Sequence, residues 1–523
     1  MVHSNVSGET VADIEVLSDA VPTLTSMPDP SHVFVSYVRE DSDAVDKLCR
    51  VMQAAQIPYW RDRTHLGPGD AWKSKIRDAI QSGALVFLPC FSENSRSKRT
   101  SYMNEELSLA VDEFRKMPPG RTWIIPVRFD DAPLPDWDLG ANRHLSDYNY
   151  VDLFGDDYVV QAANLVATVG RLMGSSTDAA AVQAAVAQAD DADRGDLLRR
   201  LTKEMLPDPS RRIELDDTIR QEGRRLLVAL CDEARFPLVT SDSREQRVIA
   251  LVEQATAIWH LVEPFCTSLQ VATRWAEPAQ LGPWTSGLQA LGTDAKKLRE
   301  GLVPLIELHY LPTLLTTMVV GLTGVGTDRW DNVKALIVDL TITERGNSYA
   351  DSLIDVASPW SPFSNAKIVA NILNRTAGTE DDPTTVLALY DNGKVPQFYT
   401  PESDWLHKIL RPSFHDLFPD DENYSAQFDR AECMLGLISQ DLANQRVVET
   451  GQTWQDRSRW FGRSTWRVNH SFNALTLITR DLARQQKGWP PLRAGLFGGD
   501  LARADAAVVA YTEAFDKVSA GRW

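Results

Sequence analysis

The sequence predicts an α/β domain in its first third, followed by a mostly α-helical region. From His32 to about Met173, short apolar runs alternate with amphipathic helical stretches. Alternating βα units of this length imply a parallel sheet with helices on both of its faces. Beyond a Gly-Ser-rich linker, apolar residues recur at the three- and four-residue spacing of long helices.

These changes in composition divide the chain into four sections. Residues 1–30 are rich in Ser, Thr, Asp and Pro, with five acidic residues and no Lys or Arg, and we predict a disordered acidic leader. Residues 31–173 form the α/β domain, and residues 174–192 form a linker. Residues 193–523 form a mostly helical region of one or two subdomains, because 523 residues are too many for a single core.

Five strands are predicted in the α/β domain. Each is a short run rich in β-branched and aromatic residues, and they cover residues 32–37, 58–60, 84–89, 122–129 and 150–153. Helices are predicted between them over residues 42–55, 71–82, 101–116 and 159–172. In the third helix, apolar residues at helical spacing mark the buried face, namely Met103, Leu107, Ala110, Val111 and Phe114.

In the second region, helices are predicted over residues 193–205, 215–233 and 245–269. The one β-hairpin signal covers residues 386–398, where Asn392-Gly393 separates two apolar runs. The most apolar stretch, residues 311–325, is short for a bilayer span, so we predict a buried core helix and no membrane segment. The glycines at 321–326 lack the lysine of a phosphate-binding loop and indicate close helix packing or a loop.

Composition and charge argue against several classes of function. With 43% hydrophobic and 24% charged residues the chain resembles an ordinary soluble protein, and its net charge of −18 argues against nucleic-acid binding. Because the first basic residue is Arg39, we expect no signal peptide. Five scattered cysteines fit a reduced, cytoplasmic chain, and nine scattered histidines indicate no metal site.

Tyr102 and Glu106 form the most informative pair of residues. On a helix they share one face, and this helix follows an apolar strand whose carboxyl end lies where open α/β sheets bind ligands. An aromatic ring beside a carboxylate can hold a flat ring and stabilise a sugar cation. Glu105 points about 100° away by helix geometry and is expected in solvent.

Each candidate also has a purely structural interpretation. Glu106 can be a solvated helix acid, and Tyr102 can cover the helix start. Ser36 and Tyr37 end the first strand, where they either face a pocket or serve as a cap and a packed ring. Trp72 either packs in the core or forms a pocket wall. Basic residues near this edge can receive a diphosphate or merely solubilise the protein: Arg39, Arg63, Arg96, Lys98 and Arg99.

Several short motifs follow one another along the first part of the chain. They are Phe34-Val35-Ser36-Tyr37 with Asp41, Tyr59-Trp60-Arg61-Asp62 leading into Leu66-Gly67-Pro68-Gly69 and Trp72, Phe91-Ser92-Glu93-Asn94-Ser95 with Ser101 to Glu106, and Ile124-Ile125-Pro126-Val127. Residues from about 30 to 173 therefore resemble a bacterial TIR domain of the NAD-hydrolase type, which implies a flavodoxin-like five-stranded parallel sheet. Catalytic members usually carry Trp-x-x-x-Glu, and Tyr102 here offers a smaller ring for stacking.

The resemblance implies an NAD+ glycohydrolase or cyclase with Glu106 as the catalytic residue. Ser36, Tyr37, Trp72 and Tyr102 would bind NAD+, which is the substrate, with no cofactor and no metal. One carboxylate can suffice because nicotinamide leaves as a neutral molecule and needs no general acid, unlike the leaving group of an ordinary glycoside.

The resemblance also implies self-association through the BB loop, residues of about 62–70, with adjacent TIR domains completing the active site. The family context implies bacterial anti-phage defence, in which the helical region senses an unknown activating ligand or protein or drives assembly. The alternative is a non-catalytic TIR adaptor that only binds other TIR domains.

Overall fold

The computed structural model describes residues 32–55, 57–61, 86–98, 101–116, 122–140, 143–155, 158–172, 191–240, 243–342, 351–451, 460–467 and 473–520. The chain divides into two compact units, one of Met1–Gly155 and Asn164–Thr177, the other of Asp156–Ala163 and Asp178–Trp523. Several expectations lie outside the described residues: the leader over 1–30, the BB loop over 62–70, the helix over 71–82 that contains Trp72, and most of the linker.

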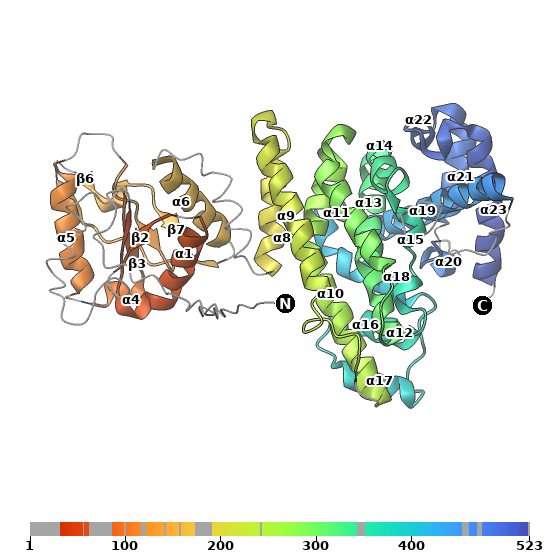
Figure 1. Cartoon of the computed structure of the whole chain (residues 1–523), viewed down its shortest axis with the longest axis horizontal. Coiled ribbons are helices and arrows are strands. Elements are labelled where there is room, and N and C mark those ends of the chain that lie inside the picture. Colours follow the sequence, from red (N-terminus) through yellow and green to blue (C-terminus); the bar gives the residue numbers. More distant parts are fainter. Residues whose placement is uncertain are drawn as a thin grey trace, which may run out of the picture. The chain divides into compact units, whose positions relative to one another are not determined.

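A five-stranded parallel sheet forms the centre of the first unit, as predicted (Figure 1). Its strand order is β2-β1-β3-β4-β7. The strands are β1 (Val33–Ser36), β2 (Tyr59–Trp60), β3 (Val86–Phe91), β4 (Val127–Arg128) and β7 (Val151–Asp152). Ser36, the last residue of β1, lies opposite Pro89 of β3. The carboxyl ends of the two central strands therefore lie side by side.

The fourth strand is shorter than the predicted run of residues 122–129. Regular pairing with β3 is confined to Val127 and Arg128, and an isolated bridge joins Ile124 to Phe87. Pro89 of β3 lies between these two places, on the side of its strand that bonds to β4, and it has no N–H to donate, which interrupts the ladder. A small antiparallel pair, β5 (Asp138–Gly140) and β6 (Arg143–His144), follows β4 in the chain.

The helices of this unit are α1 (Ser42–Ala54), α4 (Glu93–Arg96), α5 (Tyr102–Phe114) and the part of α6 (Tyr158–Leu172) from Asn164 onward. In α5 the whole predicted stripe from Met103 to Phe114 is buried. A row of stacked rings fixes this helix on the sheet, with centroid separations of 4.9 Å for Phe34–Trp60, 5.4 Å for Phe34–Phe87, 5.9 Å for Phe87–Trp123 and 6.3 Å for Trp123–Phe114. Because the row ends on α5, aromatic packing sets the distance between that helix and β1.

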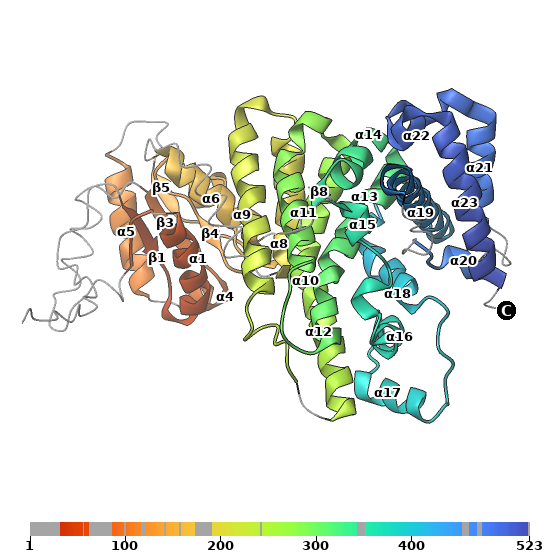
Figure 2. The ribbon, with the colours of Figure 1, turned by 45° about the vertical axis from the view of Figure 1, so that its right-hand side comes forward.

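The second unit is built from helices, as predicted. The longer ones are α8 (Asp191–Met205), α9 (Arg212–Leu230), α10 (Arg244–Trp275), α11 (Gly282–Ala295), α13 (Leu311–Thr327), α16 (Lys367–Thr376), α18 (Pro401–Leu410), α19 (Asp421–Thr450), α21 (Ala474–Gln485) and α23 (Leu501–Ala520). Helix α13 packs against α10, α11 and α19 in the middle of the unit (Figure 2).

Helix α13 is the buried core helix that its apolar sequence predicts. All residues from Leu311 to Val325 are buried, and a Cβ atom at Gly321 would lie 2.9 Å from Leu435 of α19, so the two helices pack closely there. Among the described residues, one helical stretch, Val303–Thr327, is long and apolar enough to cross a membrane, and 83% of its most apolar window is buried inside the protein. That burial is typical of a core helix.

The predicted hairpin over residues 386–398 is wrong. Residues Pro383–Asp391 form helix α17, which begins at an Asp382 cap that accepts from the amide of Thr385. The Asn-Gly pair ends this helix: Gly393 has a φ of +63°, and the amide of Lys394 donates to the carbonyl of Leu389 at 2.9 Å. This is a Schellman C-cap, which uses the same left-handed glycine as a hairpin turn.

A buried ionic cluster joins α18, α19 and the short helix α20 (Ser464–Arg467). Asp429 lies 3.3 Å from Arg463 Nε and 2.8 Å from Arg467 Nε. Glu432, 1% exposed, accepts from the Ser403 hydroxyl and from the Ser464 amide at 3.2 Å. Burial, together with the nearby Asp429 carboxylate, raises the pKa of Glu432 to about 8.

Because of this cluster, we predict that the free energy of unfolding of the helical unit falls as the pH rises from about 6 to 8. Because the pKa of Glu432 lies above its ordinary value of 4.5, the folded unit keeps a proton that the unfolded chain has released. The stabilisation is complete below about pH 4.5 and is lost as the pH rises through about 8, with a slope of at most about 1.4 kcal/mol per pH unit. Urea denaturation followed by tryptophan fluorescence measures this slope.

Glu432→Gln should flatten the slope, because it removes the titrating group. Glu449→Gln is the matched control, since Glu449 is an exposed carboxylate on the same helix. Equal slopes in the wild type and in Glu432→Gln would show that another group holds the proton.

Candidate active site

The carboxylate of Glu106 lies at the carboxyl edge of the sheet because of its position in α5. Ser101 caps the start of this helix and accepts from the amide of Asn104 at 3.2 Å. Glu106 follows Met103 by three residues and precedes Ala110 by four, so it projects from the side of the helix that packs on the sheet. Its exposed fraction is 6%, which is unusual for a glutamate on a helix.

Ser36 supplies a hydrogen-bond donor to this buried carboxylate. Its hydroxyl donates to Oε2 of Glu106 at 2.5 Å, across 70 positions of sequence. Ser36 is 1% exposed and ends β1, so its position is set by the pairing of β1 with β3. The structure thus brings together two of the residues that the sequence singles out, and the solvated-acid interpretation of Glu106 does not hold.

The other predicted residues are placed only in part. Tyr37 follows Ser36 and is 9% exposed, which fits a packed ring. Tyr102 is the first residue of α5, but its side chain lies outside the described part of the protein, as does Trp72. Glu105 is exposed, as predicted.

The described basic residues near this edge are exposed or bound to neighbouring acids. Lys98 Nζ lies 2.6 Å from Glu40, and Arg96 lies 3.5 Å from Glu93. Arg39 is exposed, and Arg63 and Arg99 are outside the described residues. The structure therefore identifies no diphosphate contact among the described residues of this group.

Sequence reasoning missed a second buried group at the same edge. Asp41, 7% exposed, accepts from the Ser92 hydroxyl at 2.5 Å and from the Asn94 side-chain amide at 2.8 Å. Both donors follow β3, and Asp41 lies between β1 and α1. All three residues belong to the motifs quoted above, but nothing in their spacing reveals that they meet. Their hydrogen bonds tie together the segments that follow the two central strands.

Thiol chemistry does not compete with the carboxylate here. Burial raises the pKa of Cys49 to about 11, and burial also raises the pKa of Cys90 well above its ordinary value. Both thiols therefore stay protonated at neutral pH and are poor nucleophiles. Within the described residues, no group of three His, Cys, Asp or Glu side chains lies close enough to hold a metal ion.

Comparison with protein families identifies the family of the α/β domain. The family model described as "TIR domain" matches residues 33–166. These residues are a TIR domain. The match covers all five strands of the sheet, together with Ser36, Asp41 and Glu106. No family model matches the residues of the helical unit beyond the TIR domain, and no curated protein matches the chain.

The Asp41 group should stabilise the carboxyl edge of this TIR domain. Asp41→Ala leaves the Ser92 and Asn94 donors without their acceptor, at a cost of about 1.5 to 3 kcal/mol for a charged partner. Hydrogen exchange followed by mass spectrometry should show amides of β1 and β3 exchanging roughly 10- to 100-fold faster. Asp43→Ala, at an exposed position in the first turn of α1, should leave these amides unchanged, and equal protection in both variants would contradict this role.

Proposed function

We propose that the TIR domain is an NAD+ glycohydrolase, or a cyclase, that cleaves the nicotinamide–ribose bond with Glu106 as its catalytic residue. The observation that carries this proposal is the burial of Glu106 at the carboxyl edge of a parallel sheet, with the Ser36 hydroxyl donating to its carboxylate. Ligands bind at this edge in open α/β folds.

The chemistry needs only one carboxylate. Nicotinamide departs from a pyridinium as a neutral molecule, so no acid has to protonate it, and positive charge develops on the ribose. An ionised carboxylate beside the ribose can accept hydrogen bonds from its hydroxyls and stabilise the oxocarbenium-like transition state. Ser36 acts as a positioning residue in this proposal, because its 2.5 Å hydrogen bond orients the carboxylate that would receive the ribose.

The buried environment supports this use of the carboxylate. With 6% of Glu106 exposed, water screens its charge poorly, and an attraction to a ribose cation is stronger than at a solvated surface. A residue that only bridged TIR domains would instead be expected on an exposed face. This difference favours the enzyme over the adaptor.

We further propose that self-association of TIR domains activates the enzyme and that the protein acts in the bacterial cytoplasm as an effector of anti-phage defence. Both statements rest on the resemblance to catalytic TIR domains. The BB loop would contact the adjacent copy, and the helical unit would respond to an activating ligand or protein. Specific activity that rises with protein concentration would support activation by assembly.

The test is NAD+ consumption by concentrated full-length protein, with chromatography of the products. Glu106→Gln preserves the shape of the side chain but removes its charge, so we expect a loss of rate of roughly 100-fold or more. Glu105→Gln is the matched control, because Glu105 is the exposed neighbour on the same helix, and its rate should stay within about twofold of wild type. Nicotinamide with ADP-ribose would indicate hydrolysis, and nicotinamide with cyclic ADP-ribose would indicate cyclisation.

Two outcomes would contradict the proposal. Equal rates in the wild type and in Glu106→Gln would exclude Glu106 as the catalytic carboxylate. An inactive wild type, even when TIR assembly is forced by fusion to an oligomer, would favour the adaptor.

A further inference from the structure

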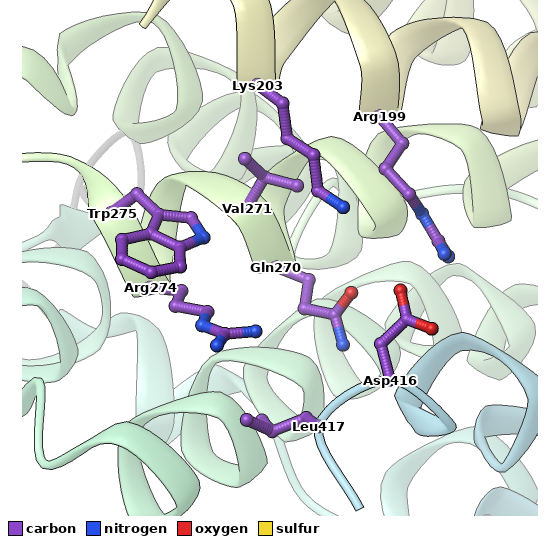
Figure 3. Close-up of a pocket in the computed structure, with 8 residues that line it drawn as sticks. All are labelled: Arg199, Lys203, Gln270, Val271, Arg274, Trp275, Asp416 and Leu417. Atoms are coloured by element: carbon purple, nitrogen blue, oxygen red, sulfur yellow. The ribbon is translucent and has the colours of Figure 1, made fainter. Parts of the chain in front are cut away.

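A solvent-open hollow of about 500 Å³ lies in the helical unit, at the end of α10. It is lined in part by Lys203 of α8 and by Arg274 and Trp275 of α10. A smaller hollow shares these three residues and adds Arg199, Gln270 and Asp416 (Figure 3). The larger volume falls within the range of small-molecule sites in proteins.

Three cationic side chains meet here in a protein whose net charge is −18. Arg199 and Lys203 are one helical turn apart on α8, and Figure 3 shows both extending toward Gln270 and Asp416. Neither they nor Arg274 form an ion pair with any residue in the described part of the chain, and the buried Nε of Arg199 has no hydrogen-bond partner there. Asp416 is the one carboxylate in the lining, so the hollow carries an excess of positive charge.

Helix dipoles are a simpler explanation for the presence of these cations. Both α8 and α10 end nearby, and a helix C-terminus attracts positive charge. The carbonyls at the end of α10 already have other donors. Arg329 donates to the carbonyls of Arg274 at 3.4 Å and Ala276 at 2.5 Å, and Asn332 donates to Ala276 at 2.8 Å. The dipole favours Lys203 and Arg274, which lie in the last turns of their helices, although Arg274 is not needed as a cap. It does not account for Arg199, which lies more than one turn before the end of α8.

An exposed indole completes the lining. Trp275 is 58% exposed, whereas most tryptophans of the described helical unit are buried. The guanidinium carbon of Arg274 lies 4.6 Å from the centre of its ring, which holds the cation beside the indole. The exposed part of the ring can receive a second flat ring by stacking.

The amide of Gln270 lines the smaller hollow and is held in place there. Its Nε2 donates to the carbonyl of Ser413 at 2.9 Å, which fixes the orientation of the side chain. A fixed amide beside cations and an exposed ring is the kind of polar group that orients a ligand in a pocket.

We propose that this hollow binds a nucleoside phosphate, with the base on Trp275 and the phosphates among Arg199, Lys203 and Arg274. All nucleoside phosphates share a flat ring joined to a charged anion, and this is the chemistry that the hollow would recognise. A free nucleotide fits better than a polynucleotide, because the site is a local group of cations on an acidic protein rather than a long basic surface. The assignment does not depend on the proposed activity of the TIR domain.

The experiment is calorimetric titration of the full-length protein with ATP. Lys203→Glu should weaken binding roughly tenfold or more, because it replaces a phosphate partner with a repelling charge. Lys394→Glu is the matched control, since it makes the same charge change at an exposed lysine elsewhere on the helical unit, and it should bind ATP like wild type. Trp275→Ala should weaken the binding of ATP roughly tenfold and leave the binding of inorganic pyrophosphate unaffected.

Each of these results would overturn the proposal: no ATP binding by wild type, equal losses in Lys203→Glu and Lys394→Glu, no loss in Lys203→Glu, or pyrophosphate binding as tightly as ATP. A short single-stranded oligonucleotide is titrated in parallel. Tighter binding of the oligonucleotide than of ATP would overturn the assignment in favour of a single-stranded nucleic acid.

Discussion

The hydrogen bond between Ser36 and Glu106 is the contact on which the geometry of the candidate active site depends. A carboxylate removed from water is costly unless a donor replaces the lost solvent. The domain meets this requirement by placing the last residue of a central strand against the second turn of a helix. Strand pairing fixes Ser36, and the row of stacked rings from Trp60 to Phe114 fixes the helix. A large displacement of either element would lengthen this hydrogen bond and weaken it.

Much of this arrangement could be predicted from the sequence, because it depends on local patterns. The alternation of strands and helices predicted the parallel sheet, and the apolar stripe of α5 predicted which face is buried. Ser36 and Glu106 were each predicted to lie at the carboxyl edge, but their contact spans 70 residues and depends on the docking of a helix. The Asp41–Ser92–Asn94 group was missed for the same reason.

The hairpin error has a different origin. A glycine with positive φ after a polar residue serves both a hairpin turn and a helix C-cap, so the Asn392-Gly393 pair could not distinguish them. Asp382 and Pro383 did carry a helix-start signal, because a capping Asp followed by Pro is typical of the first turn. The two signals had to be weighed together, since the periodicity of a short apolar run is ambiguous.

The net charge of the chain does not predict the local charges found in the helical unit. The net charge of the chain is −18. The helical unit nevertheless contains a buried carboxylate with a pKa of about 8, and three cationic side chains lie around an exposed indole. Such features arise from helix packing and not from composition, because residues far apart in sequence supply them.

The most direct test of the central claim is a crystal structure of full-length Glu106→Gln with NAD+ in the assembled state. Our account predicts that NAD+ binds intact at the carboxyl edge of the sheet, with a hydroxyl of the nicotinamide-bearing ribose within hydrogen-bonding distance of residue 106. NAD+ bound elsewhere, or no bound NAD+ at saturating concentration, would contradict it.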